Sequence, residues 1–344
     1  MKEEYFMRIV NAKAQYVSME GNPIEFIERV GRTCYKSEDK IDEGTAEKFV
    51  ERLSSSGHLA MLEFGYVYMK ASKRLLKALR RYIFQKHRDD SLLTTPRPNY
   101  FNIVNDYVTA SFRALIDMFN EIAIPCVATN PIYELSAVLS KLYPTVFKWT
   151  WKCSAEHFID EYDPAAVIFN NRASYIEDVT LHCDKVVADT VFYNTLPHSV
   201  LFTVDRGITH ELVRHRPCSF AMESTRYCSY DKGKFGSEIT VVKPCFLEES
   251  TADPKWVAWK SAVCACEAMY LTMLNEGCTA QEARAVLPNS LKADLWMCAV
   301  EREWQHILNL RLAGKTGKPH PQMVEVMEQL EPQISEATNG RVHI

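Results

Sequence analysis

The sequence has few features of disulfide-bonded, secreted or membrane-spanning proteins. Its eleven cysteines include no Cys-x-x-Cys pair, the spacing that is typical of zinc and redox sites. An odd number of scattered cysteines fits reduced thiols better than a disulfide framework. No apolar run approaches the length of a membrane span, and residues 1–10 lack the apolar stretch of a signal peptide. We therefore expect a cytoplasmic protein, and we predict no metal site.

The sequence also lacks a basic excess, internal repeats and low-complexity tracts. Its formal net charge is -4 and its pI is about 6.2, whereas nucleic-acid-binding domains usually carry a clear positive charge. With 344 residues, 47% of them hydrophobic and 24% charged, the chain can bury one large core or two smaller ones. These features favour an ordinary globular protein and disfavour a general nucleic-acid binder.

Basic residues do gather in one segment, RHRPCSFAMESTRY at residues 214–227. An apolar-periodic segment at 206–213 precedes it, so the cluster begins where a predicted helix ends. Cations are common at helix C-termini, and a solvated basic face is the simpler alternative. The second half, residues 219–227, predicts a loop that mixes hydroxyl, aromatic and arginine side chains. Together these residues favour a site that holds a phosphate and stabilises negative charge on a conjugated ring.

Hydrophobic periodicity predicts an α+β (mixed α/β) fold, in which long helices flank a central, mostly antiparallel sheet. Strands are predicted at residues 8–19, 65–70, 198–205 and 238–244. Helices are predicted at 22–35, 45–56, 256–276, 301–312 and 322–336. Gly57 supplies a helix stop.

Three blocks resemble the flavin-dependent thymidylate synthases. The pattern Arg-His-Arg, two residues, Ser, four residues, Ser, one residue, Arg-Tyr is similar to the signature of that family. A second block at 282–312 has an arginine before Leu-Pro and another that closes Asn-Leu-Arg. The segment GHLAMLEF at 57–64 is a third, weaker match. The resemblance implies a family-like core at 1–70 and 197–344, with a mainly helical insertion at 71–196.

The resemblance also implies an activity. Members of this family are FAD-dependent methyltransferases that convert dUMP to dTMP. Methylenetetrahydrofolate donates the carbon, and reduced FAD, recharged by NADPH, donates the hydride. It further implies a homotetramer whose sites are shared between subunits.

Site residues follow from the matched motif positions. Arg311 corresponds to the catalytic arginine that polarises the uracil ring, and Ser224 to a positioning and polarising hydroxyl rather than a nucleophile. Arg226 and Arg284 correspond to phosphate-binding arginines. The implied flavin contacts are Arg214, His215, Arg216, Arg302, His306, Glu63 and His58. The implied substrate contacts are Glu211, Arg214, Glu223, Ser224, Thr225, Arg226, Arg284 and Arg311.

Several positions depart from the family pattern. Val300 replaces an asparagine that touches the flavin, and Phe64 replaces a histidine. Ala60 and Met222 stand where a small hydroxyl residue and Glu or Gln are frequent. Glu211 replaces a common glutamine, and we expect it to be ion-paired with Arg214 or a neighbouring arginine.

The insertion and the departures leave alternatives open. Residues 72–88 and 99–123 are predicted helices, and the first is basic and amphipathic. A packed, solvated face is the simplest interpretation of this helix. An RNA- or membrane-surface element, an active-site cap and a subunit interface are others. For the whole chain, the alternatives are a silent nucleotide- or flavin-binding paralogue, an enzyme acting on another pyrimidine nucleotide, or a weakly supported nucleic-acid-binding module.

Overall fold

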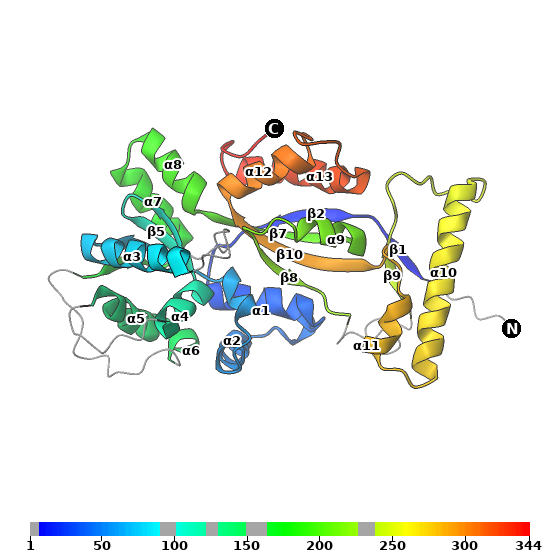
Figure 1. Cartoon of the computed structure of the whole chain (residues 1–344), viewed down its shortest axis with the longest axis horizontal. Helices are drawn as coiled ribbons and strands as arrows, with labels where there is room; N and C mark the ends of the chain where they lie inside the picture. Colours follow the sequence, from blue (N-terminus) through cyan, green and yellow to red (C-terminus); the bar gives the residue numbers. More distant parts are fainter. Residues whose placement is uncertain (1–6, 90–100, 122–129, 149–163, 226–237) are drawn as a thin grey trace.

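A four-stranded antiparallel sheet forms the centre of the molecule (Figure 1). The computed structural model describes residues 7–89, 101–121, 130–148, 164–225 and 238–344. The strand order is β2-β7-β10-β8. These strands are β2 (Lys13–Val17), β7 (Pro197–Asp205), β10 (Lys292–Val300) and β8 (Ser219–Met222). None of the described helices combines the length and the apolar character needed to cross a membrane.

Strand β10 separates two hydrophobic cores, because successive side chains on a strand point to opposite faces. Leu295 and Met297 enter the core under three helices, whereas Trp296 and Cys298 enter the core on the other face. The three helices are α9 (Arg206–Leu212), α12 (Glu301–Arg311) and α13 (Pro321–Ala337). Figure 1 shows α12 and α13 on one side of the sheet and α1 on the other.

Helix α1 (Pro23–Cys34) covers the Trp296 face. Its Phe26 packs edge-on against Trp296, with ring centroids 5.7 Å apart. Helix α2 (Thr45–Ser55) approaches α1 closely at Gly31, where an added Cβ would lie 2.6 Å from the Phe49 ring. The short 3-10 helix η2 (Leu59–Phe64) follows, so the segment at 57–64 lies next to the central sheet.

A second four-stranded antiparallel sheet has the order β4-β5-β3-β6. Its strands are β4 (Phe101–Val104), β5 (Tyr107–Ser111), β3 (Tyr66–Ala71) and β6 (Ala166–Phe169). The surrounding helices are α3 (Lys73–Asp89), α4 (Phe112–Glu121), α5 (Pro131–Leu142), α6 (Pro144–Phe147), α7 (Arg172–His182) and α8 (Lys185–Thr195). Strand β3, from the predicted core segment, thus pairs with strands of the predicted insertion.

The predicted single helix at 99–123 is wrong. Residues 101–111 form the β4–β5 hairpin, and only α4 is helical. Asn105 in the turn has φ of 55°, a left-handed conformation that asparagine tolerates better than most residues. The β-branched and aromatic residues on either side favour strands, and all five residues of β5 are buried.

The predicted strand at 8–19 is two strands in different sheets. Strand β1 (Arg8–Val10) pairs in parallel with β9 (Thr240–Val242), whereas β2 joins the central sheet. This small sheet lies at the end of the molecule that carries α10 (Pro254–Asn275) and α11 (Ala280–Ala283) (Figure 1).

The fold class and most of the other predicted helices and strands are confirmed. The five long predicted helices agree with α1, α2, α10, α12 and α13 to within two residues at each end. The basic helix is α3, and its Leu75 and Leu79 are fully buried in the core of the second sheet. This packing supports the packed-face interpretation of the helix.

Candidate functional site

Helix α9 begins at the end of β7 and sets the position of the basic cluster. The carboxylate of Asp205 caps the helix by accepting a hydrogen bond from the Ile208 backbone N–H at 2.8 Å. Its other oxygen accepts from Gln322 Nε2 at 2.5 Å, which ties α9 to the start of α13. These two hydrogen bonds anchor the start of α9, and the basic cluster follows at the end of this short helix.

Arg311, at the end of α12, is held by two groups of the α9 region. Its Nε donates to His215 Nε2 at 3.0 Å. Its Nη1 and Nη2 donate to the side-chain and backbone oxygens of Glu211 at 2.9 and 3.2 Å. Glu211 is thus ion-paired with an arginine, but that arginine is Arg311 rather than Arg214. These contacts fix the plane of the Arg311 guanidinium.

His215 supports Arg311 as a neutral ring. It is buried, and burial, followed by the charges of Arg311 and His306, lowers its pKa to about 4. Because an arginine N–H can only donate, Nε2 of His215 is the acceptor and its proton is on Nδ1. The middle residue of the Arg-His-Arg motif is therefore a hydrogen-bonding support at neutral pH.

The two arginines of that motif have the opposite character. Arg214 and Arg216 are exposed. Neither forms an ion pair with any residue in the described part of the chain. Two exposed guanidinium groups without an ion-pair partner among the described residues, beside a buried, neutral histidine, are suited to an anionic ligand that approaches from solvent.

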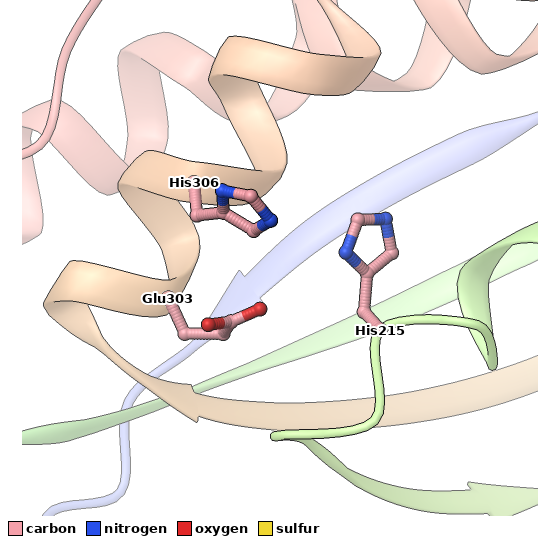
Figure 2. Close-up of side chains that lie close together, drawn as sticks. All are labelled: His215, Glu303 and His306. Carbon is pink, nitrogen blue, oxygen red and sulfur yellow. The ribbon is translucent and has the colours of Figure 1, made fainter. Parts of the chain in front are cut away.

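Two further predicted flavin contacts lie on α12. His306 is exposed, and its ring lies 6.3 Å from the His215 ring, centroid to centroid. Figure 2 shows these two rings with Glu303, which precedes His306 by one helical turn. Arg302 points elsewhere, because its Nη1 lies 3.5 Å from Asn194 Oδ1 on α8.

Glu223 lies on the other face of the sheet. It follows β8 and is 2% exposed. Its carboxylate accepts from Lys292 Nζ at 2.9 Å and from the Asp294 backbone N–H at 3.1 Å. Lys36, just after α1, pairs with both Glu223 and Asp294. These contacts all involve Oε2 of Glu223, and the role of this carboxylate in substrate binding stays a prediction.

The same network shifts the pKa values of Asp294 and Lys36. Burial alone would raise the pKa of Asp294, but the ammonium groups of Lys292 and Lys36 lower it below its usual value. Burial alone would lower the pKa of Lys36, but Glu223 and Asp294 raise it. Sequence analysis missed this cluster. A signal was present, since Lys292 and Asp294 are two residues apart and share one face of a strand.

Ser224 contacts the end of α1, and Thr225 contacts Arg284, which follows α11. The backbone N–H of Ser224 donates to the Cys34 carbonyl oxygen at 3.2 Å. Arg284 is exposed, and its Nη1 donates to Thr225 Oγ1 at 3.4 Å. Arg226 and Tyr227 lie outside the described residues. The loop predicted at 219–227 is wrong for its first part, because residues 219–222 form β8 along the edge of β10.

The segment at 57–64 reaches the start of β8. Glu63 accepts from Arg113 Nη1 at 2.8 Å. Burial raises the pKa of Glu63, although a hydrogen bond to the Ser219 side chain opposes that shift. His58 is exposed just before η2. The third block of the sequence therefore lies beside the first block in space.

The departures from the family pattern have visible local consequences. Val300 is the N-cap of α12 and provides no side-chain acceptor, so that helix start lacks the usual capping hydrogen bond. Phe64 is buried among aromatic residues, and Ala60 is exposed. Met222 Sδ lies 3.5 Å from Arg206 Nη1.

The predicted site residues fall into groups on opposite faces of the central sheet. Arg311, His215 and Glu211 belong to the face covered by α9 and α12. Glu223 shares the other face with Asp294 and Lys36, next to α1. The described hydrogen bonds of Arg311 and Arg284 go to different partners.

This arrangement defines an α+β protein in which two exposed arginines, unpaired among the residues that the structure describes, follow the end of α9. Such a protein is suited to anionic ligands. Residues 193–337 match the model of the family described as thymidylate synthase complementing protein. These residues contain β7, α9, β8, β10 and α12, the elements that carry most of the candidate site. The resemblance to flavin-dependent thymidylate synthases is thereby confirmed over this part of the chain.

Curated proteins are also similar to part of this chain. A flavin-dependent thymidylate synthase of Geobacter sulfurreducens is 29% identical over 139 residues, which are 39% of this chain and 56% of the relative. One of Pyrococcus furiosus is 31% identical over 110 residues, 32% of this chain and 43% of the relative. One of Mycobacteroides abscessus is 31% identical over 158 residues, which are 41% of this chain and 60% of the relative. The chain thus spans about half the length of the curated relatives it matches.

A solved structure also aligns with most of the chain. It is a UMP/dUMP methylase, PolB from Streptomyces cacaoi, bound with 5-Br dUMP. The alignment covers 98% of this chain and 100% of the other at 14% identity, with a TM-score of 0.38. That score is too low to establish a shared fold.

Proposed function

We propose that this chain is a flavin-dependent thymidylate synthase, an FAD-dependent methyltransferase that converts dUMP to dTMP. Methylenetetrahydrofolate would donate the carbon, and NADPH would supply the reducing equivalents. The observation that carries the proposal is the position of Arg311 within the matched region 193–337, held by His215 and Glu211.

Arg311 would polarise the pyrimidine. Its guanidinium stays charged at any accessible pH, and its plane is fixed from two sides before a ligand arrives. Such preorganised charge stabilises an anionic ring without reorganisation during the reaction. The neutral His215 contributes by holding Nε of Arg311 rather than by moving a proton.

The residues present fit a flavin dinucleotide. Arg214 and Arg216 offer exposed guanidinium groups that are unpaired in the described part of the chain, and a diphosphate requires such donors. Arg302, His306, Glu63 and His58 are the further proposed contacts. Bound FAD would supply the hydride, and the protein would supply orientation and charge.

The nucleotide phosphate would bind to the residues around Arg284 and Thr225. Arg284 and Thr225 are already in contact, and Ser224 and Arg226 adjoin them in sequence. The proposed substrate set is Glu211, Arg214, Glu223, Ser224, Thr225, Arg226, Arg284 and Arg311. Two cationic groups and hydroxyl donors are adequate for a phosphate dianion.

We further propose a cytoplasmic homotetramer that shares its sites between subunits and uses neither nucleic acid nor membrane as a partner. The separation of Arg311 and Glu223 on opposite faces of one sheet supports sharing, because a second subunit can complete each half-site. Residues 1–70 and 197–344 would form the family-like core, and residues 71–196 an insertion.

Two alternatives are favoured by a specific observation. Val300 removes a polar contact at the start of α12. A silent nucleotide- or flavin-binding paralogue, or an enzyme that modifies another pyrimidine nucleotide, would tolerate this loss. Such a protein would bind flavin or nucleotide without forming dTMP.

Tritium release from dUMP labelled at the methyl-accepting carbon tests the proposal, with FAD, NADPH and methylenetetrahydrofolate supplied. We expect turnover in the wild type and its loss in Arg311→Ala. Arg81→Ala, an exposed arginine of α3, is the matched control and should retain activity. A folded, flavin-bound wild type that releases no tritium would refute the proposal and favour the alternative.

A further inference from the structure

Three potential metal ligands meet between α12 and the loop that follows α9. They are His215, Glu303 and His306, and their ligand atoms all lie within 4.8 Å of one another. Figure 2 shows the Glu303 carboxylate and the His306 ring turned toward the His215 ring. Glu303 and His306 are three residues apart on one helix, a spacing that places both on the same face.

We propose that His215, Glu303 and His306 bind a transition-metal ion such as Zn²⁺, and that this metal competes with the hydrogen bond between His215 and Arg311. Two imidazoles and one carboxylate form a ligand set that zinc accepts, with water in the fourth position. In the helix, a Glu-x-x-His pair is a spacing that natural metal-binding bundles also use.

The geometry needs only small adjustments. Ligand atoms around a tetrahedral zinc lie about 3.4 Å apart, given bonds of about 2.0–2.1 Å. The three atoms, which lie within 4.8 Å of one another, must therefore approach by up to about 1.4 Å. His306 is exposed and Glu303 is half-buried, so both can move, whereas the buried His215 provides the fixed ligand.

Competition follows from the chemistry of the His215 ring. Figure 2 shows Nδ1, the nitrogen next to the side-chain stem, facing Glu303 and His306. Nε2 accepts the Arg311 Nε–H, so the proton of the neutral ring is on Nδ1. A metal on Nδ1 needs the lone pair there and moves that proton to Nε2. Nε2–H and the Arg311 Nε–H would then be two facing donors, and the contact would break.

The charge around the site limits its affinity. Arg311 contacts His215 directly, and the charge of Arg302 acts on Glu303. Both cations repel a divalent metal. We therefore expect weaker binding than in closed four-ligand structural sites, and reversible inhibition rather than a permanent structural ion. The inhibitory consequence rests on the proposed function of Arg311, whereas the binding itself does not.

Direct binding tests the site independently of turnover. The purified full chain is titrated with Co²⁺, whose visible spectrum distinguishes imidazole and carboxylate ligands from thiolates of the free cysteines. Zn²⁺ affinity is then measured by competition with a chromophoric chelator. We expect one site of this kind in the wild type, and binding at least about tenfold weaker in Glu303→Gln and His306→Gln. Circular dichroism checks that each variant is folded.

A matched control comes from α7, where His182 lies 3.2 Å from Asp178. His182→Gln should leave affinity unchanged. Arg311→Ala removes both the competing donor and a cation, so it should bind the metal more tightly than the wild type. A wild type that binds no Co²⁺ or Zn²⁺ outside its thiols, or variants of Glu303 and His306 that bind like the wild type, would overturn the site. Unchanged affinity in Arg311→Ala would overturn the competition.

Turnover provides the last comparison. If the chain is a thymidylate synthase, Zn²⁺ should inhibit it, and Glu303→Gln should resist that inhibition several-fold. Inhibition that is equal in both proteins contradicts the inhibitory role. If the chain shows no turnover, the proposed function fails, and the binding measurements still decide whether the site exists.

Discussion

At the scale of single residues, the most consequential contact is the pair of Arg311 and Glu211. The carboxylate holds the guanidinium in place but also neutralises part of its charge, and both groups are partly exposed. Glu211→Gln keeps a carbonyl acceptor at the same position and removes the negative charge. Because a partly exposed ion pair contributes about 0.2–1 kcal/mol, we expect the KM for dUMP to fall by about 1.4- to fivefold.

Steady-state kinetics of Glu211→Gln and Glu211→Ala separate positioning from charge. The alanine variant loses the acceptor as well, so its kcat should fall while that of the glutamine variant is maintained. A glutamine variant with an unchanged or higher KM would mean that the carboxylate does not oppose the substrate's negative charge.

The ion pair of Glu211 was predictable from the sequence, but the identity of its partner was not. An extra carboxylate among arginines predicts an ion pair from electrostatics alone, and that pair exists. Its identity was not predictable from neighbours in sequence, because Arg311 is one hundred residues away in the chain. Likewise, the motif identified His215 as a candidate, but its neutral state depends on burial and on the charges of Arg311 and His306.

At the scale of secondary-structure elements, the network between β8, β10 and α1 ties the candidate site to the sheet. Glu223→Ala removes a buried carboxylate and leaves the half-buried ammonium groups of Lys36 and Lys292 with Asp294 as their remaining carboxylate. Breaking a buried pair in this way costs about 3–5 kcal/mol. We expect the free energy of unfolding to fall by about 3 kcal/mol, measured by urea denaturation.

Exposed Glu43, in the turn before α2, is the control for that experiment. Glu43→Ala should change stability by less than about 0.5 kcal/mol. If Glu223→Ala is instead as stable as the wild type and only binds dUMP more weakly, the carboxylate serves the substrate rather than the sheet.

Elements were predictable where periodicity is strong and uninterrupted. Helices α1, α12 and α13 carry apolar residues on one face and end near capping or polar residues, so their limits could be read from sequence. The β4–β5 hairpin and β8 could not. Short buried strands fit a helical as well as a strand pattern, and only pairing with β3 or β10 selects the strand.

At the scale of the whole molecule, a buried network joins the predicted insertion to the core. His198 on β7 lies 3.1 Å from Arg172 of α7 and 3.1 Å from Glu301 of α12. Burial, and then the charge of Arg172, lowers its pKa to about 4. Although His198 faces a carboxylate, the ring is neutral at pH 7 and the contact is a hydrogen bond rather than an ion pair.

A lowered histidine pKa makes stability dependent on pH. The unfolded chain takes up a proton near pH 6.5, whereas the folded chain resists it down to about pH 4. Stability is therefore lost as pH falls through this window. We expect about 2 kcal/mol less stability at pH 5 than at pH 7 from this residue. Urea denaturation should show a shallower pH dependence in His198→Gln, and no such change in His182→Gln. Equal slopes in all three proteins would contradict the assignment.

Sharing of sites between subunits can be tested by co-expressing two inactive variants of the chain. If Arg311 of one subunit meets Arg284 of another, co-expressed Arg311→Ala and Arg284→Ala chains form some sites in which both arginines are intact. Random assembly gives about a quarter of such sites, so co-expression should restore about a quarter of wild-type tritium release. Light scattering should show a tetramer. Because Arg311 and Arg284 bind different partners within one chain, a mixture as inactive as either variant alone would mean that each chain completes its own site.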